Sequence, residues 1–194
     1  MKLYNAPTSP FGRKAAIVAR EHGIKLDEET TNPFESDQLA RINPLKLIPV
    51  LVLDDGAVLL ESHLICEYLD SIGTGPTLYP EANRWLWRTR MMIGHGLAEA
   101  SVQLRLQQVL PDGEQSATLK TRYAERMARA VAALDGQADA LAEGEMRMDK
   151  ICAVMGIGHM EFRHGGDWRG DAPNLAAWYD DAMARPSFAA TDPN

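Results

Sequence analysis

Three short segments in the first third of the chain carry side chains suited to holding a small charged molecule. The first, Thr8-Ser9-Pro10-Phe11-Gly12, places hydroxyls where a predicted strand gives way to a predicted helix. The positive end of a helix favours anions, and a thiolate is an anion. A serine hydroxyl that donates to a bound thiol sulfur would favour the ionised form. The alternative interpretation is that Ser9 or Thr8 only caps the helix.

The magnitudes allow thiolate stabilisation at such a position. Lowering a thiol pKa from about 8.5 to about 6.5 requires roughly 2.7 kcal/mol of differential interaction. One charge-assisted hydrogen bond contributes about 1.5–3 kcal/mol, and a helix dipole contributes about 0.3–1 kcal/mol. A single hydroxyl at the helix end is therefore sufficient, without a metal.

The second segment is Asn43-Pro44-Leu45-Lys46-Leu47-Ile48-Pro49-Val50. A proline directly before a buried strand suits the strand's first residue, where no backbone donor is needed. If the Ile48–Pro49 bond is cis, the Ile48 N–H and C=O turn outward and can pair with an extended peptide ligand. An ordinary trans proline at a strand start is the alternative.

The third segment is Glu61-Ser62, at the junction of a predicted strand and helix. The Ser62 N–H and hydroxyl at a helix N-terminus suit a carboxylate. Glu61 beside them suits an ammonium group. A carboxylate and an ammonium on one carbon describe the end of an amino acid. The alternative is a plain helix cap at Ser62 with an exposed glutamate.

The elements that must position these segments follow the order β-α-β-α-β-β-α. We expect strands at 2–5, 26–30, 50–53 and 58–60, and helices at 11–22, 36–42 and 62–72, with Ile65, Leu69 and Ile72 as the buried stripe of the last helix. The first two strands, joined through a helix, should be parallel, and the last two should form an antiparallel hairpin. This order is typical of a thioredoxin-like domain.

The rest of the chain is helical in pattern. A segment rich in glycine and proline, 73–80, predicts a linker between a domain at 1–75 and an all-helical domain at 82–194. Predicted helices run over 83–109, 119–141 and 148–162, and a further one begins near Pro173. The fold class predicted is therefore α/β followed by all-α.

Composition narrows the function. The chain has 194 residues, 45% of them hydrophobic, with 20 Lys and Arg against 27 Asp and Glu, for a net charge of −7. An acidic chain without a basic cluster argues against nucleic acid or a membrane surface as partner. Two widely spaced cysteines, Cys66 and Cys152, form no disulfide framework and no paired metal motif. We expect a reduced, cytoplasmic protein that needs no metal.

Taken together, the three segments closely resemble the glutathione S-transferase superfamily. Ser9-Pro10-Phe11 matches its active-site position at the start of the first helix, and 43–51 matches its cis-proline segment. Glu61-Ser62 with 65–70 matches its γ-glutamyl site and third helix. The runs at 173–179 and 184–188 look like the last helix of bacterial members, so the resemblance covers essentially the whole chain.

The resemblance implies a role for each matched residue. Ser9 would stabilise the glutathione thiolate, with Thr8 or a backbone amide as alternatives for the contact to sulfur, and Phe11 would border the sulfur. Ile48, before Pro49, would pair its backbone with the cysteinyl unit. The γ-glutamyl end would lie on Glu61 and Ser62, and Lys46 would meet the glycyl carboxylate unless it is a solvated surface lysine.

The implied function is a detoxifying glutathione transferase that conjugates glutathione to a small hydrophobic electrophile, or reduces the electrophile with it. The helical domain would form the electrophile pocket, and the family usually forms homodimers. The alternative is a relative without catalysis that acts as a protein-interaction module, for example on RNA polymerase. The sequence departs from the family at Met146, where a capping Ser or Thr often stands three residues before a buried aspartate, here Asp149.

Overall fold

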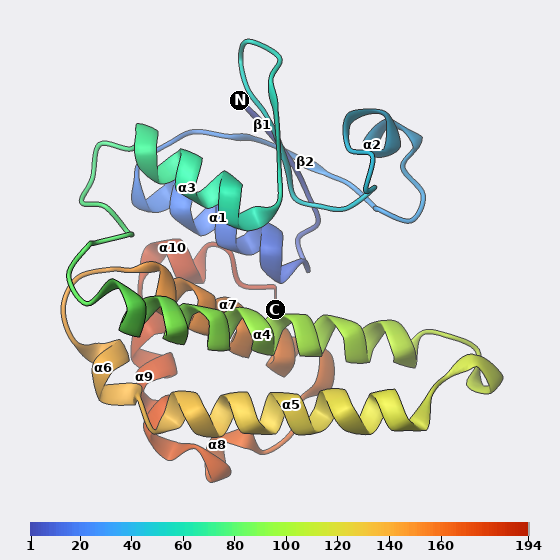
Figure 1. Cartoon of the computed structure of the whole chain (residues 1–194), viewed down its shortest axis with the longest axis vertical. Helices are drawn as coiled ribbons and strands as arrows, with labels where there is room; N and C mark the ends of the chain where they lie inside the picture. Colours follow the sequence, from blue (N-terminus) through green and yellow to red (C-terminus); the bar gives the residue numbers. More distant parts are fainter. Residues whose placement is uncertain (194) are drawn as a thin grey trace. The chain divides into compact units, whose positions relative to one another are not determined.

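Four strands form one mixed sheet in the order β2-β1-β3-β4 in the computed structural model, which describes residues 1–193 (Figure 1). The strands are β1 (Lys2–Asn5), β2 (Asp27–Thr30), β3 (Val50–Val52) and β4 (Val58–Leu60). β1 pairs with β2 in parallel, and β3 pairs with both β1 and β4 in antiparallel fashion. The predicted parallel pairing of the first two strands and the antiparallel hairpin of the last two are thus confirmed.

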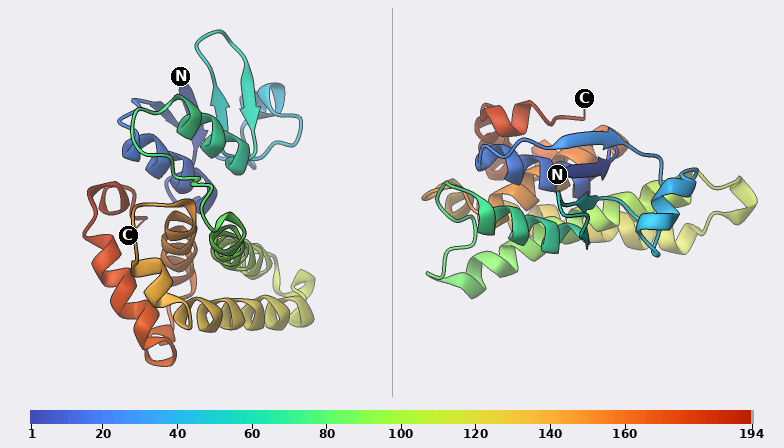
Figure 2. Two further views of the ribbon diagram at one scale, coloured as in Figure 1. Left: turned by 60° about the vertical axis from the view of Figure 1, so that its left-hand side comes forward. Right: turned by 90° about the horizontal axis from the view of Figure 1, so that it is seen from above.

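Alternation along the strands gives the sheet two apolar faces. Tyr4 and Val50 are register partners, and they pack with Leu39 of α2 (Asp37–Ile42). Leu3 and Leu51, the next pair, therefore point to the opposite face, and both are fully buried. α1 (Pro10–Glu21) and α3 (Ser62–Ile72) lie side by side on that face (Figure 2). This is a thioredoxin-like arrangement, as predicted.

The third helix differs in detail from the expectation. Its N-cap is Glu61 rather than Ser62, because the Glu61 carboxylate accepts a hydrogen bond from the His63 N–H. Ile65 and Leu69 are fully buried, whereas Ile72 is 43% exposed because the helix ends there, at Gly73. The predicted buried stripe therefore ends one turn early.

The chain divides into two compact units, Met1–Pro80 and Glu81–Asn194. The second unit holds α4 (Arg84–Gln108), a short 3-10 helix η1 (Asp112–Glu114), α5 (Ala117–Asp135), α6 (Ala138–Ala142), α7 (Met148–His164), α8 (Trp168–Asp171), α9 (Pro173–Met183) and α10 (Pro186–Ala189). α4 packs along both α5 and α7 (Figure 1). α7 is the central helix of this unit, because nearly all of its residues are buried.

Close approach of α4 and α7 explains two glycines that are poor helix formers. A Cβ added at Gly94 would lie 2.6 Å from the carbonyl carbon of Cys152. A Cβ added at Gly156 would lie 2.6 Å from the carbonyl oxygen of Gly94. Only glycine lets these backbones come so near, so α4 stays continuous through Gly94.

The predicted helix over 119–141 is wrong as a single element. It breaks at Gly136-Gln137 into α5 and α6, although the buried residues keep their helical spacing on both sides of the break. The Gln137 side chain donates to the Ala133 carbonyl at 2.9 Å, which satisfies an acceptor at the end of α5. Among the described residues, no helix has both the length and the apolar composition needed to cross a membrane.

Candidate functional site

Ser9 ends the loop after β1 and caps α1. Its backbone is extended, and its hydroxyl oxygen accepts a hydrogen bond from the Gly12 N–H at 3.3 Å. The capping alternative is therefore present in the structure. Capping uses the oxygen as an acceptor only, and within residues 1–193 the hydroxyl proton has no acceptor. The same group can cap the helix and donate to an anion at its positive end.

Asn5 and Gly12 hold this loop in shape. The Asn5 Oδ1 accepts from the Ala6 N–H at 2.7 Å, and the Asn5 side chain lies directly against Gly12. A Cβ at Gly12 would fall 1.5 Å from Asn5 Oδ1, so position 12 accepts only glycine. Phe11, the residue predicted to border the sulfur, is half-buried in the first turn of α1.

The loop before β3 is organised by the buried side chain of Asn43. Its Nδ2 donates to the Leu47 carbonyl at 2.7 Å, and its Oδ1 accepts from the Leu45 N–H at 2.9 Å. The Ile48–Pro49 peptide bond is cis. Within the described residues the Ile48 N–H and C=O form no hydrogen bond. They remain available for pairing with a peptide-like ligand.

Lys46 lies in the same loop with a positive φ of 51°. Its ammonium donates to the Phe34 carbonyl at 3.3 Å, and no ion pair to it occurs within residues 1–193. A lysine bonded only to a carbonyl keeps its charge available for a carboxylate. Its position is compatible with both the functional and the surface interpretation.

Glu61 and Ser62 form a compact polar pair at the start of α3. Glu61 has φ 73°, an uncommon conformation for a residue with a side chain and one that concentrates at functional sites. Its carboxylate accepts from the Ser62 hydroxyl at 3.1 Å and from the His63 N–H at 2.8 Å. Ser62 is buried, and its own N–H donates no hydrogen bond within residues 1–193.

The surroundings of Glu61 stabilise its ionised form. Burial opposes its ionisation, but the His63 N–H, the charges of His63 and Lys14, and the Ser62 hydroxyl together lower the Glu61 pKa. Glu61 is therefore a carboxylate at neutral pH, as an ammonium partner requires.

Lys14 is a residue that the sequence reasoning did not single out. It lies on α1, is fully buried, and its ammonium has no hydrogen-bond partner within the described chain. Its charge acts on Glu61. Burying an ammonium without a partner is costly. The sequence feature that could have identified Lys14 is its place within the otherwise apolar face of a predicted helix.

The register of the strands brings the three segments to one end of the sheet. Tyr4, Val50 and Leu60 lie in one row across β1, β3 and β4. The residues next to that row along each strand are Asn5, Pro49 and Glu61, so the segments containing Ser9, Ile48 and Ser62 all begin at the same end of the sheet. The sequence motifs are thus neighbours in space within the first unit.

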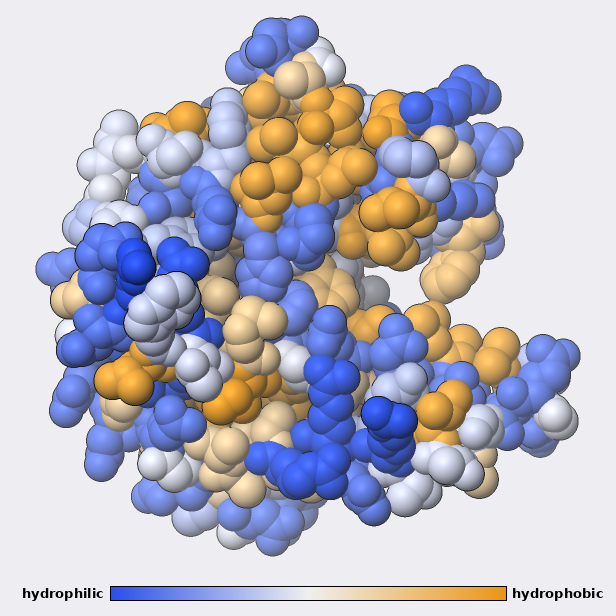
Figure 3. Space-filling model, viewed as in Figure 1, coloured by the Kyte–Doolittle hydropathy of each residue, from blue (hydrophilic) through white to orange (hydrophobic). Residues whose placement is uncertain are grey.

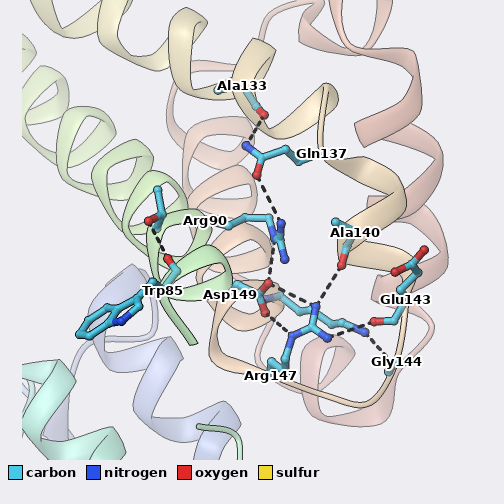
Figure 4. Close-up of polar contacts among 11 residues, drawn as sticks. Trp85, Arg90, Ala133, Gln137, Ala140, Glu143, Gly144, Arg147 and Asp149 are labelled. Carbon is cyan, nitrogen blue, oxygen red and sulfur yellow. Dashed lines mark hydrogen bonds and ion pairs between the residues drawn. The ribbon is translucent and has the colours of Figure 1, made fainter. Parts of the chain in front are cut away.

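The second unit holds a polar cluster of a different kind around Asp149, at the start of α7 (Figure 4). Arg90 from α4 donates to this fully buried carboxylate at 2.8 Å, and Arg147 donates to it at 3.2 Å. Arg147, not Met146, is the N-cap of α7, and its side chain makes no capping bond. The Asp149 carboxylate accepts from the Lys150 N–H at 3.0 Å and so takes the place of the missing hydroxyl cap. Both arginines are therefore engaged within the chain.

Further along α7, a hydroxyl is hydrogen-bonded to an imidazole. Ser101 of α4 and His159 of α7, both buried, share a hydrogen bond of 2.7 Å. Burial, together with the charges of Arg163 and His164, lowers the pKa of His159 to about 3. His159 is therefore neutral and structural at physiological pH. Among residues 1–193, no group of three or more His, Cys, Asp or Glu side chains is placed to hold a metal ion.

The first unit has a thioredoxin-like fold, and the second unit is all-helical. A family model for the glutathione S-transferase N-terminal domain matches residues 3–77. The uncharacterized GST-like protein YibF of Escherichia coli is 30% identical over 202 residues, covering 100% of this chain and 98% of that protein. The chain belongs to the glutathione S-transferase superfamily.

Solved structures agree with this assignment over the full length. A glutathione transferase family member from Pseudomonas fluorescens, crystallised with bound glutathione, matches at 32% identity and a TM-score of 0.92, covering 100% of this chain and 98% of that chain. A second crystal structure of a family member from that organism holds S-(propanoic acid)-glutathione; it matches at 32% identity and a TM-score of 0.88, with full coverage of both chains.

Proposed function

We propose that the protein is a glutathione transferase that binds glutathione on its first unit and activates the thiol as a thiolate. The thiolate attacks an electrophilic atom of a small acceptor, forming a sulfur bond, while a leaving group departs or the acceptor takes up a proton. The observation that carries the proposal is Ser9, whose hydroxyl caps α1 as an acceptor while its proton stays uncommitted.

Each remaining residue has a complementary task in this proposal. Ile48, before Pro49, pairs its free backbone groups with the cysteinyl unit. The carboxylate of Glu61 meets the ligand ammonium, and the Ser62 N–H and hydroxyl meet the ligand α-carboxylate. Lys46 meets the glycyl carboxylate. The relatives crystallised with glutathione and with a glutathione thioether support this assignment of ligand.

The test measures the thiol pKa of bound glutathione by recording the thiolate absorbance as a function of pH. We expect a value well below the free thiol pKa of about 8.5. Ser9→Ala should raise it by about one to two pH units, because a charge-assisted hydrogen bond of about 1.5–3 kcal/mol is lost.

Ser36→Ala is the matched control. Ser36 caps α2 in the same way, accepting from the Leu39 N–H at 3.0 Å, so this variant loses a helix cap without touching the site. A similar rise of the thiol pKa in both variants would contradict the role of Ser9. No calorimetric binding at millimolar glutathione would instead favour a non-catalytic protein-interaction module.

We also propose that the protein is a cytoplasmic homodimer with a role in detoxification. Apolar side chains gather over part of the first unit (Figure 3), where the exposed large apolar residues are Phe34, Leu45, Leu47, Val58, Leu64 and Ile72. Patches of this kind mark interaction surfaces. Neither of the two buried cysteines, Cys66 and Cys152, forms a disulfide, which suits a reducing compartment. Sedimentation equilibrium should give twice the mass of one chain, and a monomer at micromolar concentration would contradict the dimer.

A further inference from the structure

Lys14 is a fully buried lysine in the first half of α1. It lies four residues after Pro10, the first residue of that helix, and residues four apart share one face of a helix. Long side chains in a helix lean back toward its N-terminus. We therefore expect the Lys14 side chain to lean toward the turn that begins at Ser9, the end of α1 at which the three segments of the site meet.

The ammonium of Lys14 has no partner of its own in the first unit. Its Nζ is buried, and among residues 1–193 it forms neither a hydrogen bond nor an ion pair. A lysine is seldom buried whole unless it is paired, because its long stem usually carries the ammonium out to water. Lys14 does not reach water, so its charge acts on the groups around it with little screening.

Glu61 is a carboxylate on which this charge acts. Burial opposes the ionisation of Glu61, whereas the His63 N–H and the charges of His63 and Lys14 lower its pKa. The helix that carries Lys14 and the helix that follows Glu61 are packed against each other. His63 is partly exposed, so solvent screens its charge more than that of the fully buried Lys14. The start of α3 therefore combines a carboxylate with a buried cation.

The net charge of this combination decides which kind of ligand it favours. A carboxylate by itself attracts any ammonium group, including that of a simple amine. A carboxylate with a buried cation nearby is close to neutral overall, and its complement is a group that carries an ammonium and a carboxylate on one carbon. The Ser62 N–H, which donates no hydrogen bond within residues 1–193, supplies a donor for that second carboxylate.

We propose that Lys14 is a positioning residue that makes the Glu61–Ser62 pair selective for a zwitterionic γ-glutamyl end over an end that carries an ammonium alone. Lys14 acts through space, while Glu61 and Ser62 make the contacts to the ligand. The inference rests on the proposed function. It identifies the α-carboxylate as the ligand group whose binding depends on the buried cation.

Three S-methylated peptides measure this selectivity by calorimetry. S-Methylglutathione has both charges on its γ-glutamyl end. 4-Aminobutyryl-(S-methyl)cysteinylglycine lacks the α-carboxylate, and glutaryl-(S-methyl)cysteinylglycine lacks the ammonium. None of the three has a free thiol, so stabilisation of a thiolate does not enter the comparison. The wild-type protein should bind S-methylglutathione about tenfold or more tightly than the aminobutyryl peptide, and equal affinities would overturn the inference without any variant.

Substitution assigns the selectivity to Lys14. Lys14→Met removes the charge and keeps the length of the side chain, so it should weaken S-methylglutathione about fivefold, or roughly 1 kcal/mol. The aminobutyryl peptide should not be weakened, because the lost cation repelled its ammonium. The glutaryl peptide should lose at least as much as S-methylglutathione, because its end is only negative. Lys14→Gln, a second neutral variant, should give the same pattern if Lys14→Met folds poorly.

Two further variants separate charge from shape. Lys14→Arg keeps the charge and should keep the preference for the α-carboxylate. Lys25→Met removes one exposed positive charge from the same unit and should leave all three affinities unchanged.

The outcomes are distinguishable. An equal loss for all three peptides in Lys14→Met, as a merely structural role would give, overturns the inference, and so do three unchanged affinities. Both results leave ligand binding by the wild-type protein intact. Failure of the wild-type protein to bind millimolar S-methylglutathione would overturn the proposed function, and the inference with it.

Discussion

The N-termini of α3 and α7 face the same electrostatic problem and solve it differently. Both present unpaired backbone N–H groups and the positive end of a helix dipole. α7 fills its end with its own fully buried carboxylate, Asp149, which two arginines then neutralise. At α3, Glu61 caps only the His63 N–H, and the Ser62 N–H is left without a partner in residues 1–193.

The difference separates a helix end that is satisfied from within the chain from one that has donors left for a ligand. A site whose polar groups are all satisfied from within the chain stabilises the fold and has nothing to offer a ligand. A site with a free donor beside a held carboxylate has capacity for a zwitterion. We therefore expect stability and binding to depend on different residues in the two units, and substitutions test that expectation.

The largest effect is expected at Asp149. Asp149→Asn removes the negative charge and leaves Arg90 and Arg147 buried without a counter-ion. Breaking a buried pair from one side costs about 3–5 kcal/mol of unfolding free energy. Urea denaturation measures this loss directly, while glutathione affinity, measured below the transition, should stay unchanged.

The control is Glu99→Gln, because the Glu99–Arg126 ion pair is 45% exposed on each side. Exposed pairs contribute about 0–1 kcal/mol, so this variant should lose little stability. If the two variants lose equal stability, the α7 end is not held by its buried charges. If Asp149→Asn also weakens glutathione binding, the separation between the two helix ends fails.

A smaller, pH-dependent effect is expected at His159. Its pKa is about 3 in the folded protein, against an ordinary value near 6.5 in the unfolded chain. The unfolded state therefore takes up a proton first as the pH falls below about 6.5, and stability is lost progressively down to the folded pKa. At about pH 4.5 the loss from this group should reach roughly 2–3 kcal/mol.

His159→Gln isolates this contribution, because the amide can still bond to Ser101 but does not titrate. The difference in unfolding free energy between wild type and variant should shift in favour of the variant between about pH 6.5 and pH 4.5. Carboxylates that titrate in the same range are common to both proteins and cancel. A difference independent of pH would show that His159 accepts a proton in the folded state.

Much of the site could be predicted from the sequence, because it depends on local patterns. Ser9 at a strand–helix junction, Pro49 before a strand and Glu61-Ser62 before a helix are each recognisable within a few residues. These segments meet at one end of the sheet because β1, β3 and β4 pair in this register. The roles of these residues stay predictions until the binding of glutathione to the protein is measured.

The features that the sequence did not reveal depend on individual side-chain contacts. The break between α5 and α6 is made by the Gln137 side chain, which periodicity cannot register. The shift of the α3 cap from Ser62 to Glu61 follows from the positive φ of Glu61. The Ser101–His159 bond requires the offset of two helices that are far apart in the chain. Long-range register decides only the last of these features; the first two depend on local side-chain bonds to the backbone.

Substitution of Lys14 is expected to have the smallest effect. It tests whether a buried side chain in the first unit lowers the stability of the fold and strengthens ligand binding. Its ammonium is fully buried without a hydrogen bond inside residues 1–193, and its charge acts on Glu61. Lys14→Met should not lower the unfolding free energy, because burying an unpaired ammonium is unfavourable. Glutathione is a net anion, with two carboxylates and one ammonium, so losing a nearby cation should weaken its binding about fivefold, or roughly 1 kcal/mol.

Calorimetry and urea denaturation on the same variant separate these two effects, with the exposed Lys25→Met as the control for loss of one positive charge. The pKa of Glu61, followed by NMR of its carboxyl carbon, should rise in Lys14→Met and stay constant in Lys25→Met. A loss of stability with unchanged affinity would make Lys14 a structural residue, like the arginines around Asp149. Unchanged stability with weaker binding would place it with Glu61, as a charge whose counterpart is the ligand.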